Sequence, residues 1–338
     1  MRTAVPQHAV LPSAKIGVDV YSLRSQDWTP IQYLDYCAAQ GAQLVHFSEI
    51  RFLGSLDTEN LRQIRSRADD LGLDLEIGMR SICPTSSIFA AEEGTAEEQL
   101  GRTIDAARIV RSSIVRCFLG NSDDRRGEIS LQTHILNTVA VLKNMRSRAL
   151  DSGIRIAIEN HSGDMQAREL KGLVESAGPE FVGVCLDSGN PVWALEDPHL
   201  ALETLAPHVL TSHIRDSRVW KTEDGAAAAW CRMGEGNIGI EAYLARYLEE
   251  CPGRPVSLEI IVKGPRYFPY RDPDFWNAYR DTPPWEFARF LTLVERGTPP
   301  PASSPPSLDP DKLRAAEMDD FRESFRWTRE FLAGSRTD

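Results

Sequence analysis

The chain has 338 residues, of which 42% are hydrophobic and 26% are charged, and its 49 acidic side chains exceed its 38 basic ones to give a formal charge of −11. This composition supplies enough apolar residues for a substantial core and therefore excludes a wholly disordered chain. The excess of acidic groups argues against nucleic acid as a partner, because such proteins work mainly by neutralising phosphates.

The six cysteines stand singly, without a Cys-x-x-Cys pair, and most lie within apolar runs. This spacing is typical of buried, reduced thiols and not of a disulfide framework or a zinc finger. The first residues contain no apolar signal core, and no run of about 18 apolar residues occurs anywhere. We therefore expect a cytoplasmic protein without a membrane partner.

Short β-rich runs alternate with longer runs of helical spacing along the chain. Strands are predicted at residues 16–22, 44–49, 73–79, 114–119, 155–161, 182–187, 209–214 and 256–262. Helical spacing follows at 57–71, 96–110 and 131–150, and Gly72 and Gly153 are placed to end two of these helices. The repeat is about 34 residues, which favours a (β/α)8 TIM barrel. An open doubly wound sheet is the alternative, but no strand leads into a Gly-x-Gly-x-x-Gly turn.

The barrel is predicted to span residues 15–297, with a long aromatic insertion after the eighth strand. A proline-rich linker is expected at 298–309, followed by a C-terminal helix at 310–333. This helix must bury its apolar stripe on its own barrel or on a second subunit, and the sequence leaves both possibilities open. The stripe consists of Met318, Phe321, Phe325 and Leu332.

Four of the late strands end in a side chain that can bind a metal. These side chains are Glu159, Asp187, His213 and Glu259. Because the carboxyl ends of barrel strands form one mouth, the four should lie together there. Three poorly solvated carboxylates repel one another, so we expect a cation between them. Three carboxylates and one imidazole suit Mn²⁺ best, with Mg²⁺, Co²⁺ or Zn²⁺ as alternatives, and the lack of a cysteine among them argues against structural zinc.

The same residues carry a resemblance to a known family. The segments Ile-Glu159-Asn-His, Leu-Asp187-Ser-Gly-Asn-Pro, His213-Ile-Arg-Asp, Met-Gly-Glu-Gly-Asn and Leu-Glu259 resemble the xylose isomerase-like TIM-barrel superfamily, the sugar phosphate isomerase/epimerase group that includes endonuclease IV. The resemblance extends from about Lys15 to Arg296. It implies that the four strand-end residues bind one divalent ion, often Mn²⁺. It also implies that Glu259 and Glu159 flank the reacting carbon, with Glu259 removing a proton and Glu159 returning it.

Two departures narrow the expected activity. Ketohexose 3-epimerases of this family carry a second glutamate and a histidine at the positions that Met165 and Asn190 occupy here. Endonuclease IV has additional histidines on its second and third strands, where this sequence has Ser48-Glu49 and Met79-Arg80. The epimerase substrate pattern is therefore incomplete, and DNA repair is disfavoured.

Further residues near the strand ends are candidates for binding a substrate. They are Tyr21, Arg80, His161, Asn190, Arg215, Arg218 and Lys263. Arginine and lysine at these positions could hold a substrate carboxylate or phosphate, or could instead neutralise acidic residues at the mouth, as Arg51 also could. His46 lies early in its strand and is interpreted as structural. The aromatic insertion, with Tyr267, Phe268, Tyr270, Phe275 and Trp276, either covers the site or contacts a second subunit of a homo-oligomer.

Three functions remain open on these grounds, all with a small sugar or sugar acid as the partner. The first is a divalent-metal-dependent sugar isomerase or epimerase that acts through an enediolate. The second is a metal-dependent lyase, either a decarboxylase of a 3-oxo sugar acid or an eliminase of a 3-oxo-glycoside, which the basic cluster favours. The third is a non-catalytic sugar-binding barrel, which the paired glutamates disfavour.

Overall fold

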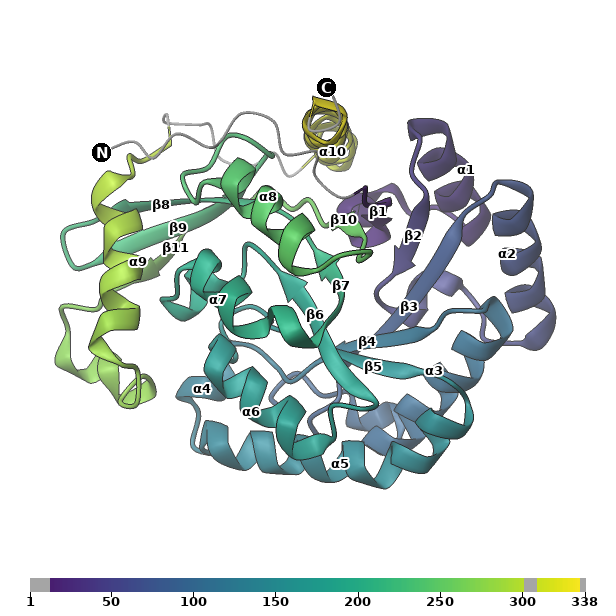
Figure 1. Cartoon of the computed structure of the whole chain (residues 1–338), viewed down its shortest axis with the longest axis horizontal. Helices are drawn as coiled ribbons and strands as arrows, with labels where there is room; N and C mark the ends of the chain where they lie inside the picture. The colour runs from purple at the N-terminus through teal and green to yellow at the C-terminus, as the bar shows by residue number, and fades with distance from the viewer. Residues whose placement is uncertain (1–12, 301–308, 335–338) are drawn as a thin grey trace.

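A computed structural model describes residues 13–300 and 309–334. Eight parallel strands form a sheet in the order β10-β1-β2-β3-β4-β5-β6-β7. Parallel pairing between Ile214 and Leu258 brings β7 and β10 together and closes the barrel. The strands are β1 (Ile16–Asp19), β2 (Leu44–Phe47), β3 (Asp74–Ser81), β4 (Ile114–Phe118), β5 (Arg155–Glu159), β6 (Val182–Asp187), β7 (Val209–His213) and β10 (Val256–Leu258). The predicted (β/α)8 architecture is confirmed (Figure 1).

Helices follow most strands and cover the outside of the barrel (Figure 1). They are α1 (Pro30–Gln40), α2 (Thr58–Asp70), α3 (Ala96–Val110), α4 (Ser122–Arg126), α5 (Leu131–Asp151), α6 (Ala167–Ala177), α7 (Pro198–Leu205), α8 (Ile240–Glu250), α9 (Pro284–Arg296) and α10 (Pro310–Gly334). Capping residues fix the ends of several helices. At the start of α3, Thr95 and Glu98 form a capping box. Gly72 and Gly153, just after α2 and α5, adopt positive φ angles of 67° and 66°.

A second sheet lies beside the barrel and was not predicted as such. It contains the hairpin of β8 (Asp216–Lys221) and β9 (Ala226–Cys231), with β11 (Arg266–Phe268) added antiparallel to β9. The run of alanines in β9 carries no alternating pattern, because all of these small residues are buried. The segment after β10 thus contributes its first part to this sheet and continues through a 3-10 helix at Pro273–Ala278 to α9.

The first and the last strand of the barrel are shorter than predicted. The first strand stops at Asp19, and a 3-10 helix, η1 (Val20–Gln26), follows directly. The last strand stops at Leu258, so Glu259 follows it instead of lying within it. Both differences arise because an apolar run continues past the hydrogen-bonded ladder into the packed core, where burial alone does not distinguish a strand from a loop.

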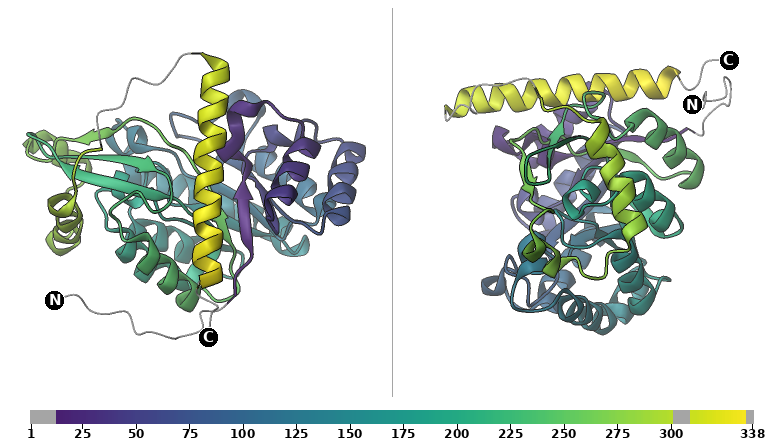
Figure 2. Two further views of the ribbon diagram at one scale, coloured as in Figure 1. Left: turned by 90° about the horizontal axis from the view of Figure 1, so that it is seen from above. Right: turned by 90° about the vertical axis from the view of Figure 1, so that its left-hand side faces the viewer.

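Helix α10 lies across the barrel beside β1 and η1 (Figures 1 and 2). Phe321 is fully buried and its ring packs against Tyr36 of α1. Arg232, just after β9, pairs with Asp319 and Asp320 of the helix. The apolar stripe of the helix is therefore buried against its own chain. The domain boundaries at 297 and 309 stay predictions, and residues 301–308 of the expected linker lie outside the described residues.

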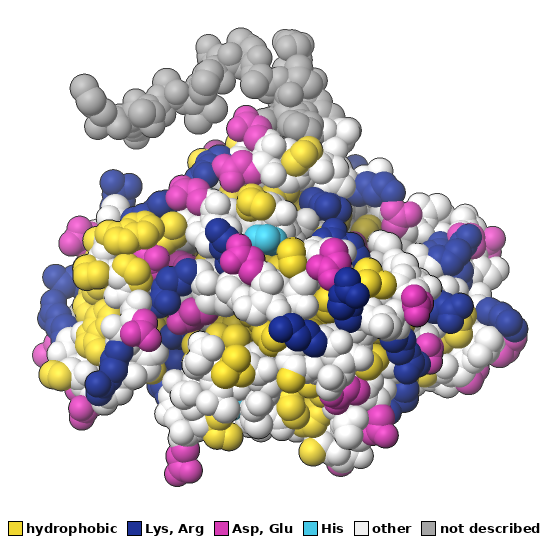
Figure 3. Space-filling model, turned by 60° about the horizontal axis from the view of Figure 1, so that its bottom comes forward, with side chains coloured by type: hydrophobic (Ala, Val, Ile, Leu, Met, Phe, Trp, Pro, Cys, Tyr) yellow, Lys and Arg dark blue, Asp and Glu magenta, His cyan; other side chains and the backbone are white. Residues whose placement is uncertain are grey.

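The surface carries charges of both signs. In Figure 3, acidic and basic side chains are interspersed, and hydrophobic side chains gather on the side of the molecule where α9 lies. No single-sign basic stripe, such as nucleic acid binding would require, is visible on the face shown. Among the described residues, no helix has the length and apolar character needed to cross a membrane.

Candidate metal centre and pocket

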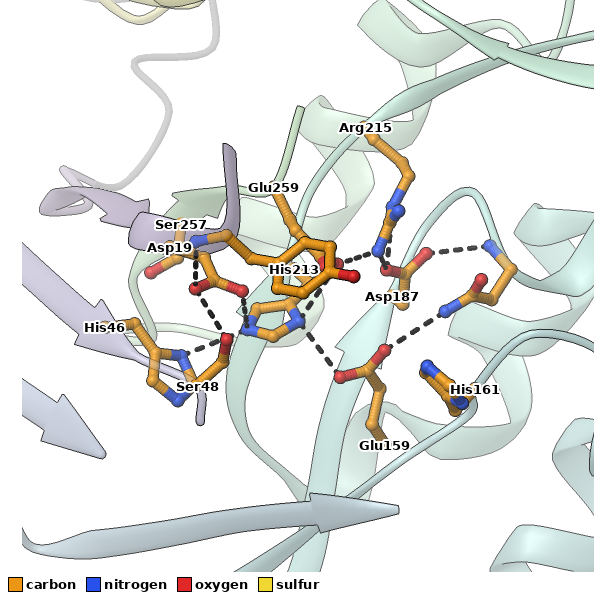
Figure 4. Close-up of polar contacts among 12 residues, drawn as sticks. Asp19, His46, Ser48, Glu159, His161, Asp187, His213, Arg215, Ser257 and Glu259 are labelled. Atoms are coloured by element: carbon orange, nitrogen blue, oxygen red, sulfur yellow. Dashed lines mark hydrogen bonds and ion pairs between the residues drawn. The ribbon is translucent and has the colours of Figure 1, made fainter. Parts of the chain in front are cut away.

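The four predicted metal-binding side chains come together at the mouth of the barrel (Figure 4). Glu159, Asp187 and His213 are the last residues of β5, β6 and β7, and Glu259 directly follows β10. Each offers one ligand atom, and these atoms all lie within 4.8 Å of one another. Parallel strands with aligned ends produce this convergence, because their final side chains meet above the same interior.

The His213 imidazole lies at the centre of the group. Its Nδ1 atom is 3.0 Å from Oε2 of Glu159 and 3.3 Å from Oε2 of Glu259. Its Nε2 atom faces the other way and is 3.0 Å from Nδ1 of His46 and 3.4 Å from Oδ2 of Asp19. Burial opposes the charge on the ring, but Cys185, Glu159 and Asp19 outweigh it and raise the pKa of His213 well above its usual value.

Asp187 is held by its own loop and by one arginine. Its Oδ1 atom accepts hydrogen bonds of 2.7 Å from the backbone nitrogens of Gly189 and Asn190. Its Oδ2 atom accepts one of 2.9 Å from Nε of Arg215, whose guanidinium also pairs with Glu259. Burial raises the pKa of Asp187 to about 6, although Arg215 lowers it.

Glu159 is paired with a second arginine, Arg116. Its Oε2 atom accepts a hydrogen bond of 2.5 Å from Nε of Arg116, and its Oε1 atom accepts one of 3.1 Å from Nδ2 of Asn190. Burial alone would raise the pKa of this carboxyl, but Arg116 and His213 hold it well below its usual range. Glu159 is therefore anionic in the absence of any added cation.

These residues fit a divalent cation. Nδ1 of His213 is buried and has no hydrogen-bond partner within the described part of the chain, although two carboxylate oxygens lie close to it. An imidazole nitrogen directed at the same point as three carboxylates is the donor set expected for Mn²⁺, Mg²⁺ or Zn²⁺. Glu159, Asp187, His213 and Glu259 would hold the ion, and His46 and Asp19 would orient the imidazole from behind.

A pocket of about 260 Å³ opens above this group. Five of the predicted substrate-binding residues line it, namely Tyr21, Arg80, His161, Arg215 and Lys263. The Lys263 amine is 4.6 Å from the ring centres of both Trp193 and Trp230, which stack on each other. Burial and the nearby positive charges of Arg215, Arg24 and Arg266 lower the pKa of Lys263 to about 8.

His161 lines the pocket as a neutral ring. Its Nδ1 atom lies 2.6 Å from the carbonyl oxygen of Gly120, and the ring stacks on Phe118 with 3.8 Å between centres. Burial lowers the pKa of His161 to about 4. The proton therefore resides on Nδ1, which donates to the carbonyl, and leaves Nε2 as an acceptor near Ser162.

Other predicted residues lie elsewhere. Asn190 contacts Glu159, and Arg218 donates from β8 to the carbonyl oxygen of Glu235. Neither residue is among those that line the pocket in the described chain, and Arg51 pairs with Glu49. The aromatic insertion does not line the pocket either: Phe268 is buried, Tyr267 is 65% exposed, and the remaining rings pack against the core.

Sequence reasoning missed several residues of the site. Asp19 ends β1 and could have been found by the same strand-end rule that identified the four ligands. Arg116 lies within the apolar strand β4, where a buried charge requires a partner. His46 was interpreted as structural, and the structure places it against His213, where it supports the candidate ligand. Its contact spans 167 residues of sequence, so no local pattern could have indicated it.

A family model described as the xylose isomerase-like TIM barrel matches residues 34–274. The chain belongs to this family. The 3-oxo-isoapionate decarboxylase of Pectobacterium atrosepticum is 25% identical to this chain over 211 residues, which are 62% of this chain and 69% of that protein. The uncharacterized protein YihM of Escherichia coli is 28% identical over 196 residues, 58% of this chain and 54% of that protein.

Solved structures with a similar fold include two sugar epimerases. L-ribulose 3-epimerase has a TM-score of 0.61 and 17% identity, with 96% of each chain covered. D-psicose 3-epimerase, crystallised in the presence of D-fructose, has a TM-score of 0.60 and 17% identity, with 94% of this chain and 99% of that chain covered. At this level of identity the likeness shows the fold alone.

Proposed function

We propose that this protein is a divalent-metal-dependent lyase that removes the carboxylate of a 3-oxo sugar acid. The observation that carries the proposal is the convergence of Glu159, Asp187, His213 and Glu259 beneath a pocket lined by positive charges. The decarboxylase relative supports the reaction type. A bound divalent ion would polarise the substrate ketone and stabilise the negative charge that develops beside it.

The charges around the pocket support an anionic substrate. Five basic side chains line it, Arg24, Arg80, Arg116, Arg215 and Lys263, against the two acidic side chains Glu49 and Glu259. Arg24, Arg116 and Arg215 pair with carboxylates, so Arg80 and Lys263 supply the positive charge that favours a carboxylate ligand over a neutral ketose. Arg80 carries no ion pair to any described residue, so its guanidinium is available to a substrate.

The pairing of the two glutamates favours decarboxylation over proton abstraction. Glu159 is bound by Arg116 and Glu259 by Arg215, and a carboxylate paired with a guanidinium is a weaker base. Decarboxylation needs no base, because the breaking carbon–carbon bond itself leaves its electron pair on the carbon next to the ketone. A proton then replaces the lost CO₂ on that carbon. We propose that this proton comes from a water molecule held by Glu259, which lines the pocket.

Product analysis in D₂O tests this proposal. The metal-loaded protein is incubated with 3-oxo-isoapionate, with other 3-oxo sugar acids, with 3-oxo-glycosides and with ketoses. We expect CO₂ release from an oxo acid, with one deuterium at the carbon that lost it. Release of an aglycone would instead indicate the eliminase. Absence of any product from all substrates, with binding retained, would indicate a sugar-binding barrel.

Two arginines near the site provide a matched pair of variants. Arg80 lines the pocket, whereas Arg218 is engaged with Glu235 outside it. We expect Arg80→Gln to raise the KM of the oxo acid, and Arg218→Gln to leave it near the parent value. An equal KM in both variants would contradict binding of the substrate carboxylate at the mouth.

A sugar epimerase is the second candidate, and one observation favours it. Glu159 and Glu259 both lie close to Nδ1 of His213, at 3.0 and 3.3 Å, so two carboxylates flank the candidate metal centre, as proton exchange at one substrate carbon would require. Deuterium incorporation into a ketose with an intact carbon chain, without CO₂ release, would favour this function over the lyase.

A further inference from the structure

A buried thiol lies directly beside the candidate metal centre. Cys185 is in β6, in register with Glu159 on one side and Thr211 on the other. It is completely buried and packs with Ile114, Ala157 and Leu210 in the barrel interior. Since paired residues of neighbouring strands point to the same face of the sheet, Cys185 and Glu159 both face the barrel axis.

Cys185 forms a second set of potential ligands with two residues of the first set. One ligand atom from each of Glu159, Cys185 and His213 lies within 4.8 Å of the other two, and all three residues are buried. Nδ1 of His213, which is buried and has no hydrogen-bond partner in the described chain, lies 3.0 Å from Oε2 of Glu159. The two sets therefore share Glu159 and His213. The first set adds oxygens from Asp187 and Glu259, and the second adds the sulfur of Cys185.

The two sets differ in the metals that they prefer. Carboxylate oxygens suit Mn²⁺ and Mg²⁺, whereas a thiolate favours softer ions such as Zn²⁺, Co²⁺ and Cd²⁺. We propose that Cys185 supplies a sulfur ligand that captures thiophilic ions on the inner side of the metal centre. This inference rests on the proposed metal function. Binding replaces the thiol proton, which passes to the buffer as the sulfur–metal bond forms.

The position of Cys185 has a consequence for activity. Cys185 is absent from the residues of the described chain that line the pocket, whereas Glu259 lines it. An ion drawn toward sulfur therefore lies further from a bound substrate than one held by Asp187 and Glu259. Thiophilic ions should bind tightly but support less turnover than Mn²⁺.

Cobalt spectroscopy on the full-length protein tests the sulfur ligand. The protein is freed of metal with a chelator and titrated with Co²⁺, while the near-ultraviolet thiolate-to-cobalt absorption and the amount of bound Co²⁺ are measured. We expect this band in the parent and in Cys251→Ser, a control that removes another buried thiol. It should be absent in Cys185→Ser. Cd²⁺ affinity should fall about 10-fold or more in Cys185→Ser, with Mn²⁺ affinity nearly unchanged.

X-ray absorption at the cobalt edge of the parent protein gives a reading that does not depend on any variant. A cobalt–sulfur distance of about 2.3 Å would support the inference. Bound Co²⁺ with only nitrogen and oxygen neighbours, or a charge-transfer band that persists in Cys185→Ser, would overturn it while leaving the proposed function intact. Failure to bind any divalent ion would overturn both.

Discussion

Arg116 and Arg215 affect the candidate ligands directly, because each pairs with a carboxylate that would also bind a cation. Arg116 pairs with Glu159, and Arg215 pairs with both Asp187 and Glu259. Each arginine is nearly fully buried, so its charge is poorly screened and the pairing is strong. Arg116 thereby keeps Glu159 ionised and ready to bind a metal, whereas burial outweighs Arg215 at Asp187 and raises its pKa to about 6.

The two glutamates should each be essential. Glu159→Gln and Glu259→Gln should lower kcat by about 100-fold or more, because each removes a candidate ligand oxygen and a negative charge that would hold the cation. Turnover, bound metal and circular dichroism are measured for both, with Glu241→Gln, an exposed position on α8, as control. Activity within a few-fold of the parent in either variant would refute the assignment.

Lys263 should give substrate binding a dependence on pH. Its pKa is lowered to about 8 by burial and by Arg215, Arg24 and Arg266, so its amine is charged below pH 8 and neutral above it. The KM for an anionic substrate should therefore rise as the pH increases through about 8. Lys263→Arg keeps the charge across this range and should give a flatter profile. Identical profiles for the two proteins would exclude a role for the Lys263 charge.

At the scale of elements, the strand ends position the candidate ligands, and the hairpin of β8 and β9 forms part of the pocket wall. Strands β5, β6 and β7 present their last side chains to one point. The hairpin of β8 and β9 adds Trp230 to the pocket wall, and Arg215 contacts its ring at 4.3 Å. The two sheets thus build different parts of the site: the barrel carries the candidate ligands, and the hairpin contributes to the wall above them.

Docking of α10 should contribute measurably to stability. Phe321 is fully buried, and Phe321→Ala should lower the free energy of unfolding by about 3 kcal/mol. Leu313→Ala on the same helix removes a side chain that is 41% exposed and should change it little. Urea unfolding and amide hydrogen exchange of α10 measure both effects. Equal stability of the two variants would show that the helix does not bury its stripe on this barrel.

At the scale of the whole molecule, an ion that binds the folded chain must stabilise it. The candidate ligands come from three strands and the residue after a fourth, spread over 101 positions from 159 to 259, so the unfolded chain does not hold them together. Mn²⁺ at about 100 times its Kd should add ~2.7 kcal/mol to the free energy of unfolding. His213→Gln should lose most of this gain, whereas His199→Gln on α7 should retain it. Thermal unfolding with Mn²⁺ and with a chelator provides the measurement, and an unchanged Tm in the parent would contradict the metal site.

The local order of residues was sufficient to predict the barrel and the four candidate ligands. Apolar runs repeated about every 34 residues specify strands that must pair in parallel, and parallel strands place Glu159, Asp187, His213 and Glu259 at one edge. The fold and the clustering of these four side chains could be predicted because both follow from periodicity and from the ends of individual strands.

Only the tertiary structure decided which distant residues meet. It paired Arg116 with Glu159, His46 with His213 and the stripe of α10 with its own barrel, and it placed Arg218 outside the pocket. It also put Cys185 beside the candidate ligands, where the sequence analysis had named no cysteine. Such contacts depend on the register between strands and on the path of loops across the barrel. Neither leaves a periodic signal in the sequence.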